Sequence, residues 1–384
     1  MREHVEALER LAGDAPTVSP SISRIARWSH NTKCGVAAAA LAARVDLDKL
    51  LECTNFEPVV GESPFMRERG QLFERRVRQN DYEDLVPILR AKLRFEARSL
   101  SSLNLKKGYP PNREGLRRRA TKTREWVDQV LSGDKEAPHL IEGAVLPVDL
   151  DGHRAYFEAD AIGLRSGPIV HGIEMKSWPF VDGRVDDPSK ASEALRQLGF
   201  YLHLLRQVVH GLGGDPTIVS DTGLLVTPLN VGLRPVGSTR DLAREISLAD
   251  KMLARLPRGA EYAELVRAGL SFGPVAEPGG TEAVRLSHLA ELAERAGTHY
   301  QTSCLGSCGL AKFCREKLHL RGDPTVCGSE VVRSLPGVRS LARAAALANG
   351  AEPTALELST GAAELVSRAG SLYSERLAQI ERAR

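Results

Sequence analysis

The sequence lacks any run of about 18 apolar residues, the shortest stretch that typically marks a membrane-spanning helix. Its first residues, Met-Arg-Glu-His-Val-Glu, lack the apolar core of a signal peptide. It also lacks internal repeats and low-complexity segments. These absences argue against a membrane protein, a secreted protein and a repeat protein. We therefore expect a folded cytoplasmic protein that has no membrane partner.

The composition is that of a folded chain, because 42% of the 384 residues are hydrophobic and 26% are charged. A chain of this length can bury a large core and suggests two structural units with additions. The net charge is only +3, but residues 90–124 include twelve Lys and Arg and two Glu. A solvated helical face and a phosphate-contacting surface both explain such a stretch. The candidate nucleic-acid contacts are Arg113, Arg117, Arg118, Arg119, Lys122 and Arg124.

Residues 155–176 carry charges in an unusual setting. Apolar and polar residues alternate on both sides of a turn at residues 165–168, which predicts a β-hairpin. Because side chains alternate between the faces of a strand, Glu174 and Lys176 share one face. The hairpin brings Asp160, late in its first strand, near that same face. Two carboxylates beside a lysine among core-forming residues are costly to bury unless they hold a cation.

A long helix is predicted at residues 190–209. Its apolar residues recur at spacings of three and four, which predicts a core-facing stripe. Gln197 and Tyr201 lie four residues apart to one side of that stripe, so they should point together toward the edge of the sheet. A further strand follows at residues 223–227. A sheet that resumes after a long helix predicts an α/β layer architecture.

The rest of the chain is mainly helical, with a second group of strands before the hairpin. The other predicted helices lie at residues 1–19, 22–28, 36–44, 66–80, 238–297 and 365–382, and within 84–131 on both sides of a breaker at 108–111. The predicted strands lie at residues 139–150, 153–164 and 169–177, separated by Gly-containing turns. Glu74 lies among several arginines of its helix, where a simple ion pair would explain it.

Six cysteines are present, and three of them lie within eleven residues: Cys304, Cys308 and Cys314. Short loops with glycine let three thiols wrap around one metal centre. A disulfide framework is not expected in a large chain without a secretion signal. Zinc would take Cys327 or His319 as a fourth ligand. An iron–sulfur cluster would take Cys327 or the distant Cys34, and ligand chemistry alone does not choose between the metals.

Five residues in chain order resemble the motifs of the PD-(D/E)xK nuclease superfamily, specifically its RecB-like branch: Asp160, Glu174, Lys176, Gln197 and Tyr201. The resemblance covers residues 20–315. The segment that leads to Cys34 is similar to the one that introduces the first cluster cysteine in the iron–sulfur members of the family. Those members include the CRISPR-associated adaptation nucleases and the nuclease subunits of bacterial helicase–nucleases.

The resemblance implies an α/β fold with a restriction-endonuclease-like core, in which helices flank a central mixed β-sheet, and with helical N- and C-terminal additions. It implies that Asp160 and Glu174 hold one or two Mg²⁺ or Mn²⁺ ions, with Glu74 as a further metal contact. Lys176 would orient or deprotonate the attacking water, and the Gln and Tyr of the following helix would position water, phosphate or a base.

The resemblance also implies a 4Fe–4S cluster that joins the two ends of the nuclease domain. Its ligands would be Cys34, Cys304, Cys308 and Cys314. Three residues separate the first two C-terminal cysteines, where the family commonly has two, and Phe73 stands at the family's usual histidine position. Cys327 is an additional thiol and an alternative ligand. Zinc stays an alternative to the cluster, and we favour iron on the resemblance.

The predicted units are an N-terminal helical segment at 1–64, a nuclease core at 65–235 with a basic helical insertion at 84–131, a helical region with the cysteine cluster at 236–330, and a small helical tail at 331–384. In the tail, residues 334–350 resemble half of a helix-hairpin-helix. Arg339 replaces the expected second glycine, and a plain helical cap is the simpler interpretation.

The sequence therefore predicts a metal-dependent DNA nuclease, an exonuclease or an enzyme of ends or single strands. DNA repair, recombination and phage defence are the expected settings, with a helicase or other repair and defence proteins as partners. One alternative is a non-catalytic DNA-binding or assembly subunit of a repair or CRISPR-type complex. The other is a zinc-stapled endonuclease of the restriction type.

Overall fold

The computed structural model describes residues 2–18, 22–29, 31–52, 56, 64–110, 112–150, 153–159, 162–178, 180–181, 184–185, 188–230, 232–255, 262–277 and 279–382. None of the helices in these ranges combines the length and the apolar character that crossing a bilayer requires.

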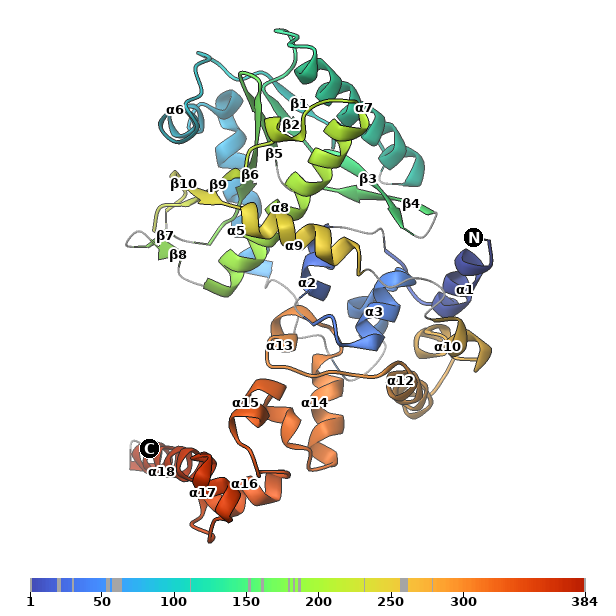
Figure 1. Cartoon of the computed structure of the whole chain (residues 1–384), viewed down its shortest axis with the longest axis vertical. Helices are drawn as coiled ribbons and strands as arrows, with labels where there is room; N and C mark the ends of the chain where they lie inside the picture. Colours follow the sequence, from blue (N-terminus) through green and yellow to red (C-terminus); the bar gives the residue numbers. More distant parts are fainter. Residues whose placement is uncertain are drawn as a thin grey trace.

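The chain folds as an α/β protein around a mixed six-stranded sheet with the strand order β1-β2-β5-β6-β9-β10 (Figure 1). Its strands are β1 (Ser102–Asn104), β2 (Leu140–Glu142), β5 (Ile162–Ser166), β6 (Ile169–Met175), β9 (Thr222–Pro228) and β10 (Pro235–Asp241). β1 pairs with β2, and β6 with β9, in parallel, and the other neighbours are antiparallel. Two small sheets pair β3 (Val145–Leu150) with β4 (His153–Glu158), and β7 (Phe180–Val181) with β8 (Arg184–Val185). The predicted α/β class and mixed sheet are confirmed.

Helices cover the sheet and form both ends of the chain (Figure 1). Those that precede α8 are α1 (Arg2–Ala12), α2 (Ile22–Ser29), α3 (Gly35–Ala42), α4 (Leu47–Leu51), α5 (Pro64–Arg78), α6 (Val86–Leu93) and α7 (Arg113–Leu131). The later ones are α8 (Pro188–Gly211), α9 (Ala243–Leu253), α10 (Ala263–Arg267), α11 (Gly273–Ala276), α12 (Glu282–Ala296), α13 (Cys304–Ser307), α14 (Ala311–Leu320), α15 (Ser329–Ser334), α16 (Leu341–Ala348), α17 (Ala355–Ser359) and α18 (Ala362–Arg382). Short 3-10 helices are η1 (Gln79–Tyr82), η2 (Pro216–Ile218) and η4 (Pro324–Cys327).

The hairpin predicted at residues 155–176 is formed by β5 and β6, whose antiparallel register pairs Ile162 with Ile173. Gly167 makes the turn with a φ of 60°, a conformation that glycine adopts without a steric penalty. The first strand of the hairpin is shorter than predicted, because the strand predicted at 153–164 is divided into β4 and β5.

The strand predicted at residues 139–150 is also divided, into β2 and β3. Gly143 separates the two halves with a φ of 64°. A Cβ at that position would lie 2.5 Å from the side chain of Lys106 and 2.8 Å from the guanidinium of Arg119. The division therefore depends on one glycine, and alternation of apolar and polar residues on either side of it does not reveal the bend.

β1 lies in a region where only helices were predicted, and β10 overlaps the start of the region predicted to be helical from residue 238. α6 ends at Leu93, Arg94 adopts a left-handed conformation with a φ of 53°, and the chain continues into β1. β1 is three residues long and is fixed by its parallel pairing with β2, far along the chain. β10 pairs with β9 after a short loop. Long-range pairing of this kind overrides local propensity and leaves little trace in the local sequence.

A row of glycines lets α8 approach the sheet closely. Gly163, Gly172 and Gly223 lie on the adjacent strands β5, β6 and β9. A Cβ on Gly172 would lie 2.6 Å from Cδ1 of Leu198, and one on Gly223 would lie 2.7 Å from its Cδ2. The apolar stripe of α8 therefore packs directly on the strand backbones. This close packing brings the polar side chains of α8 within reach of the end of β6.

Each face of the sheet has its own apolar core. On one face, Val170 of β6 packs with Leu198 of α8. On the other face, Ile173 of β6 packs with Phe73 of α5. Side chains of β6 therefore alternate between the two helices, as the hairpin pattern predicted. Glu174, one residue after Ile173, belongs to the face that α8 covers.

The N-terminal helices α2 and α3 lie beside the helices α12 to α14 from the other end of the chain (Figure 1). One apolar core includes Leu11 and Ile25 of the N-terminal segment, Leu198 of α8, and Leu289 and Leu310 of the later helices. This core therefore contains residues from three of the predicted units.

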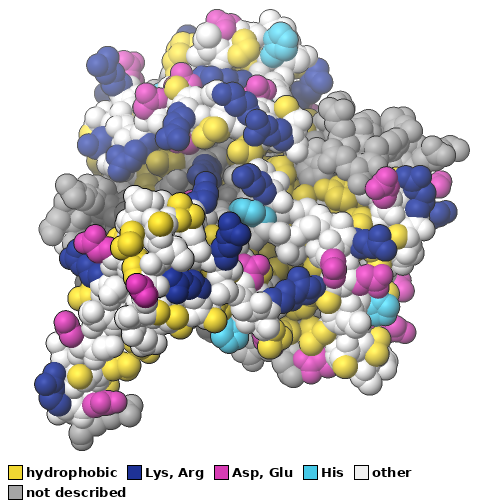
Figure 2. Space-filling model, turned by 60° about the horizontal axis from the view of Figure 1, so that its bottom comes forward, with side chains coloured by type: hydrophobic (Ala, Val, Ile, Leu, Met, Phe, Trp, Pro, Cys, Tyr) yellow, Lys and Arg dark blue, Asp and Glu magenta, His cyan; other side chains and the backbone are white. Residues whose placement is uncertain are grey.

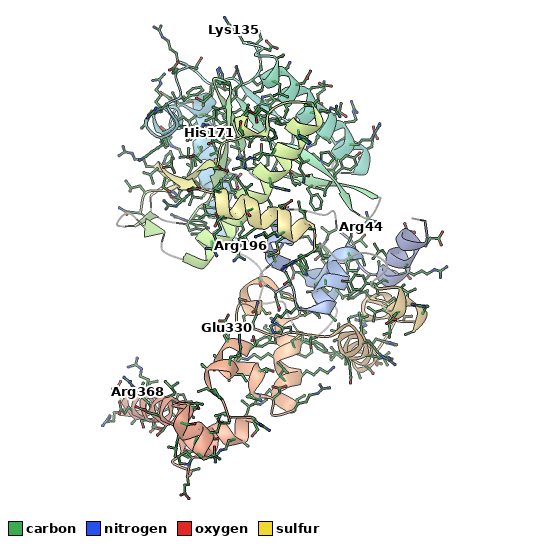
Figure 3. All side chains as sticks on the ribbon, viewed as in Figure 1. Arg44, Lys135, His171, Arg196, Glu330 and Arg368 are labelled. Carbon is green, nitrogen blue, oxygen red and sulfur yellow. The ribbon has the colours of Figure 1, made fainter. Side chains whose placement is uncertain are left out.

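The C-terminal tail has a small core of its own, which includes Val338, Leu347 and Val366. Figure 3 shows Arg368 of α18 at the opposite end of the molecule from His171 of β6. α18 extends past this core, and its last turns are exposed. The surface helix predicted at residues 365–382 is confirmed.

Candidate functional site

Glu174 and Lys176 form an ion pair at the carboxyl end of β6, with 2.8 Å between Nζ of Lys176 and Oε1 of Glu174. Both lie on the face that α8 covers, in register with Gly172, which contacts Leu198. The side chain of Glu174 is 2% exposed and that of Lys176 is 27% exposed. The prediction that these two residues share one face is confirmed, and their arrangement joins a buried carboxylate to a cation that solvent can reach.

Gln197 of α8 extends this ion pair into a chain of polar groups. Lys176 Nζ donates to Oε1 of Gln197 at 3.3 Å, and Nε2 of Gln197 donates to Oε1 of Glu193 at 3.3 Å. The amide therefore presents its oxygen to the ammonium and its NH₂ to the carboxylate. The sequence analysis did not select Glu193. Its position one turn before Gln197, on the same side of the helix, is the signal that would have found it.

Tyr201, predicted beside Gln197, lies in the apolar core. It is 1% exposed, and its hydroxyl oxygen lies 2.6 Å from where a Cβ on Gly163 would stand, next to Ile141. Among the described residues this hydroxyl has no hydrogen-bond partner. Burial raises the pKa of the phenol well above its usual range. The structure thus brings Gln197 to Lys176 and leaves Tyr201 inside the packing between α8 and the sheet.

Asp160 lies outside the residues that the structure describes. Ile162, which begins β5, pairs with Ile173, the residue before Glu174. The described part of the hairpin therefore ends beside the ion pair, and the proximity of Asp160 to Glu174 stays a prediction.

α5 contacts two strand ends of the sheet. Near its start, Nε of Arg69 donates to the carbonyl oxygen of Ser177 at 3.3 Å. At its end, Nε of Arg78 lies 3.0 Å from Oε2 of Glu142, the last residue of β2. Glu74 lies along the helix between these contacts and pairs with Arg78 at 2.8 Å. The simple ion pair predicted for Glu74 is confirmed, and its side chain is 47% exposed.

Phe73, which stands where the resemblance would place a histidine, is completely buried in the core on the opposite face of the sheet from α8. It packs there with Ile173 and Tyr82. The aromatic ring fills apolar space and has no metal-binding atom, so Phe73 itself supplies no metal contact.

Glu142 is a second buried carboxylate at a strand end of the sheet, and the sequence analysis did not select it. It is 2% exposed and accepts hydrogen bonds from Arg78, Asn104 and the hydroxyl of Tyr82. Burial raises the pKa of its carboxyl group, and Arg78 opposes that shift. A carboxylate in an otherwise apolar strand is the signal that would have found it. Because Arg78 binds both carboxylates, Glu142 fixes the cation that holds Glu74.

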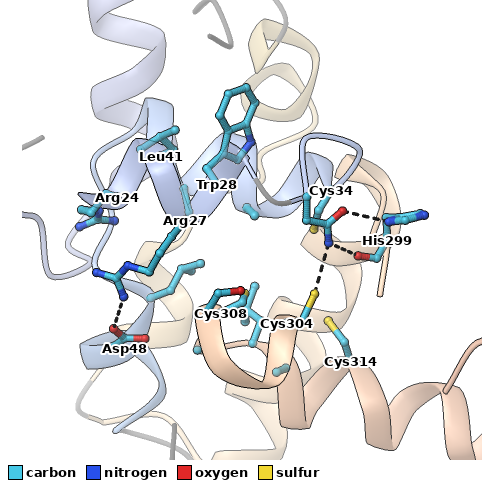
Figure 4. Close-up of a pocket in the computed structure, with 18 of the residues that line it drawn as sticks. Arg24, Arg27, Trp28, Cys34, Leu41, Asp48, His299, Cys304, Cys308 and Cys314 are labelled. Atoms are coloured by element: carbon cyan, nitrogen blue, oxygen red, sulfur yellow. Dashed lines mark hydrogen bonds and ion pairs between the residues drawn. The ribbon is translucent and has the colours of Figure 1, made fainter. Parts of the chain in front are cut away.

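The four cysteines expected to bind a metal centre line one cavity of about 270 Å³ (Figure 4): Cys34, Cys304, Cys308 and Cys314. The cavity lies between the N-terminal segment and the helices α13 and α14. Cys327 and His319 line a different hollow, and Cys327 is exposed. Of the alternative fourth ligands, the structure brings Cys34 to the other three cysteines. Cys53 lies outside the described residues.

Burial raises the pKa of three of these thiols. The pKa of Cys308 rises to about 12, and those of Cys304 and Cys314 also rise above their usual range. The neighbouring cysteines add to each shift, because each thiolate repels the others. Without a metal these thiols therefore stay neutral, and their loss of a proton requires a cation among them. The donor set suits both an iron–sulfur cluster and zinc.

Two side chains that the sequence analysis did not select join the N-terminal segment to the segment before α13, beside the cysteines (Figure 4). Asn31 donates to the carbonyl oxygen of His299 and to Sγ of Cys304. The imidazole of His299 contacts the amide oxygen of Asn31 in turn. Only their closeness in sequence to cysteines could have marked them.

The basic stretch is partly exposed and partly buried. Arg117, Arg118, Lys122 and Arg124 are exposed on α7. Arg119 is 4% exposed, donates to the carbonyl oxygen of Gly143 at 2.6 Å and pairs with Glu158 at 3.1 Å. Arg119 is therefore an interior residue, which corrects its prediction as a nucleic-acid contact. The side chain of Arg113 lies outside the described residues.

Neighbouring carboxylates on α7 form ion pairs with two of the exposed cations. Arg117 pairs with Glu114 at 3.0 Å, and the ammonium of Lys122 lies 2.6 Å from the carboxylate of Glu125. Figure 2 shows Lys and Arg side chains across the middle of one face of the molecule, beside a hollow, with Asp and Glu interspersed.

In the tail, a tight turn joins α15 to α16. Gly337 has a φ of 94° in this turn, and Val338 packs into the core of the tail. Ser340 caps α16, since its Oγ accepts a hydrogen bond from the N–H of Arg343 at 3.1 Å. A plain helical cap therefore accounts for the segment that resembles half of a helix-hairpin-helix.

No protein-family model matches this sequence, and a search of curated proteins found none similar to it. Within the described ranges, no three or more Cys, His, Asp and Glu side chains are grouped so that they could hold a metal ion. The four cysteines instead surround a cavity. The function of the protein is therefore inferred from its own residues and their geometry.

Proposed function

We propose that the protein is a metal-dependent nuclease that hydrolyses phosphodiester bonds in DNA and carries a structural 4Fe–4S cluster. The observation that carries the proposal is the contact of Lys176 with both Glu174 and Gln197, at 2.8 and 3.3 Å. These residues come from two motifs on a strand and a helix, and the motifs resemble those of the PD-(D/E)xK superfamily. A solvated Glu-x-Lys pair on a strand would need neither burial of the glutamate nor a partner on α8.

The order of the elements supports a restriction-endonuclease-like core. α5 precedes the hairpin of β5 and β6, α8 follows it, and β9 then returns parallel to β6. Helices cover both faces of the sheet. The residues of interest lie on the first helix, at the end of the hairpin and on the next helix, which is the distribution that the resemblance implies.

The chain's own groups have distinct roles in such a site. Glu174 and Asp160 would offer hard oxygen ligands to Mg²⁺ or Mn²⁺. The bound ion would polarise the scissile phosphate and offset the charge that develops on it. Lys176, held between Glu174 and Gln197, has a fixed direction from which to orient the attacking water or take its proton. Glu74 would join the site only by exchanging Arg78 for the metal.

DNA is the proposed substrate because the exposed cations of α7 offer a surface for phosphates. Arg118 and Arg124 are exposed there, and contacts to phosphates give affinity that is independent of sequence. Action on ends or single strands, and work beside a helicase or other repair and defence proteins, are the parts of the proposal that rest on the resemblance alone.

The preference for an iron–sulfur cluster over zinc rests on the resemblance, and the cavity that the four cysteines border has room for either centre. Tetrahedral zinc, with Zn–S bonds of about 2.3 Å, draws four thiolates to within about 4 Å of one another. Here the four cysteines border a cavity of about 270 Å³. This cavity extends beyond the cysteines, along Arg24, Leu41 and Asp48. The proposed cluster would have Cys34, Cys304, Cys308 and Cys314 as its ligands.

A cleavage assay on purified protein tests the proposed activity. End-labelled single-stranded and double-stranded DNA is incubated with Mg²⁺, Mn²⁺, Ca²⁺ or EDTA. We expect cleavage that requires Mg²⁺ or Mn²⁺ and that falls by about 10²-fold or more in Glu174→Gln and Lys176→Gln. Asp160→Asn tests the residue outside the described ranges. Glu330→Gln is the control, because Glu330 is exposed on α15, far from the sheet (Figure 3).

Each outcome of this assay decides between functions. Wild-type cleavage rates in both Glu174→Gln and Lys176→Gln would refute the proposed active site. DNA binding without cleavage under any of the ions would favour a non-catalytic DNA-binding or assembly subunit. Cleavage at internal positions of circular DNA would favour an endonuclease over an exonuclease.

Metal analysis under anaerobic conditions tests the cofactor separately. We expect about four irons per chain and the broad visible absorption of iron–thiolate charge transfer, both lost in Cys34→Ser. One zinc per chain and no visible absorption would show that the centre is zinc and not a cluster. Unchanged iron content in Cys34→Ser, with loss of iron in Cys327→Ser, would show that Cys327 and not Cys34 is the fourth ligand.

A further inference from the structure

Asn31 donates a side-chain hydrogen bond to the sulfur of one of the cysteines that line the cavity. Its Nδ2 lies 3.3 Å from Sγ of Cys304 and 2.5 Å from the carbonyl oxygen of His299. Its Oδ1 lies 2.9 Å from Nδ1 of His299. All the polar atoms of this amide are therefore used in contacts with a segment about 270 residues away in sequence.

The network fixes the orientation of the amide and the tautomer of the imidazole. With its oxygen and nitrogen exchanged, the Asn31 amide would place an oxygen 2.5 Å from the carbonyl oxygen of His299, which is repulsive. The NH₂ group therefore faces Cys304. Because Oδ1 can only accept, Nδ1 of His299 carries the proton that it donates to Asn31. The imidazole thus holds the amide with its donor aimed at the sulfur.

We propose that Asn31, oriented by His299, is a positioning residue that donates an N–H···S hydrogen bond to Cys304 and so sets the reduction potential and the retention of the metal centre. This inference rests on the proposed cluster. Partners beyond the ligands themselves orient ligands and tune metal centres. Hydrogen bonds to cluster sulfurs are one of the determinants of reduction potential.

The direction of the effect follows from charge. Reduction adds an electron to the centre and increases the negative charge that its sulfurs share. A donor aimed at Cys304 stabilises the more negative state, because hydrogen bonds to charged groups are stronger than those to neutral ones. Removal of the donor should therefore make the centre harder to reduce. Removal of the donor also deletes the hydrogen bond between Asn31 and Cys304, which links the N-terminal segment to the segment that carries the C-terminal cysteines. The metal centre should therefore be released more easily.

Three variants and one control test the proposal on the full chain. Asn31→Ala removes the donor, Asn31→Asp replaces it with a carboxylate that repels the sulfur, and His299→Ala removes the group that orients the amide. Ser307→Ala is the control, because Ser307 lines the same cavity but donates to the carbonyl oxygen of Ser303. The measurements are the midpoint potential in a mediator-poised titration, iron–sulfur stretching frequencies by resonance Raman spectroscopy, and the rate of iron loss to a chelator.

We expect a shift to more negative potential in Asn31→Ala of about tenfold in the one-electron equilibrium, which is about 59 mV. Asn31→Asp should shift further, His299→Ala in the same direction by less, and Ser307→Ala not at all. Combining Asn31→Ala with His299→Ala should add little to Asn31→Ala, since the two residues act as a unit. Wild-type potential and stretching frequencies in Asn31→Ala, with iron bound, would overturn the inference.

A measurement without metal separates this inference from the proposed cofactor. Urea unfolding of the apoprotein gives a double-mutant cycle between Asn31→Ala and Cys304→Ala, which should be non-additive because the two side chains are in contact. If the wild-type protein binds no iron, the proposed cluster fails, and non-additivity still supports the contact. If the cycle is additive as well, the positioning role of Asn31 fails too.

Discussion

Gly35 lies so close to the carbonyl oxygen of Ala296 that a Cβ at position 35 would overlap that oxygen. Gly35 begins α3 directly after Cys34, and Ala296 ends α12. The next residue, Val36, donates its N–H to the carbonyl oxygen of Gly297 at 3.1 Å. The loop that carries Cys34 is therefore packed backbone to backbone against the segment that leads to the C-terminal cysteines. Only glycine permits this approach.

Gly35→Ala should destabilise the protein and weaken metal retention together. The position of the added Cβ is fixed by the main chain, and the atoms that it meets belong to the main chain of Ala296, so no side-chain rotation relieves the overlap. Overpacking of this kind costs about 1–3 kcal/mol or more. Thermal unfolding should show a lower Tm, and the purified variant should hold less iron. Gly211→Ala is the matched control, because the space around Gly211 at the end of α8 is open. A Tm for Gly35→Ala equal to that of the control would contradict the expected overlap.

Gln197→Leu should slow cleavage without unfolding the protein. The substitution keeps the size of the side chain but removes the oxygen that accepts from Lys176. Lys176 then keeps Glu174 as a partner but loses the group that fixes its direction. The loss of a group that orients a functional side chain typically lowers activity by about 10–100-fold. Gln207→Leu provides the comparison, since Gln207 is an exposed amide on the same helix. Equal single-turnover rates in the two variants would show that Gln197 has no part in the site.

The core of the site could be predicted from sequence because it depends on local periodicity. Glu174 and Lys176 are two residues apart on a strand, so their common face follows from alternation alone. Gln197 lies on a helix whose apolar stripe is long and regular, so its side of the helix also follows. The same argument placed Tyr201 with Gln197, yet the glycine at position 163 opens a space in the sheet that the Tyr201 ring fills. No pattern within α8 carries that information.

The parts that sequence could not predict depend on contacts between distant segments. β1 exists through its pairing with β2, and Gly143 divides a strand because Arg119 and Lys106 occupy the space beside it. Asn31 and His299 matter only because the N-terminal segment meets the segment before α13 at the cysteines. The gathering of Cys34 with the C-terminal cysteines was implied by a family resemblance, and spacing within the chain alone left Cys327 equally eligible.

Alanine substitution of Arg119 should lower the stability of the protein, whereas alanine substitution of Arg124 should weaken DNA binding. Arg119→Ala removes a buried donor from the carbonyl oxygen of Gly143 and a partner from Glu158. A buried acceptor left unsatisfied costs about 1–3 kcal/mol, so the variant should unfold at lower urea concentration. Arg124→Ala leaves the interior intact, because Arg124 is exposed on α7.

DNA affinity measured over a range of salt concentrations separates the two effects. Arg124→Ala should weaken binding to all sequences alike and reduce the slope of log K against log[salt] by about one, the value for one lost phosphate contact. Arg119→Ala should leave the slope unchanged at temperatures where it is folded. An unchanged slope in Arg124→Ala and in Lys122→Ala would show that α7 is a solvated face and not a DNA surface.

The metal-free protein should lose stability as the pH rises above about 8.5, and the metal-bound protein should not. Burial raises the pKa of Cys308 to about 12, whereas a thiol in the unfolded chain has a pKa of about 8.5. A raised pKa in the folded state means that the unfolded state loses its proton first. The stabilising contribution of the neutral thiol is therefore complete below pH 8.5 and declines as the pH rises toward 12.

Urea unfolding of the apoprotein at pH 7.5, 9 and 10.5 measures the decline, and Cys308→Ala should show a smaller one. With metal bound, the thiolate is already formed and the cation stabilises it, so stability should be flat over this range. A decline of equal steepness in apoprotein and metal-bound protein would mean that Cys308 is not a ligand.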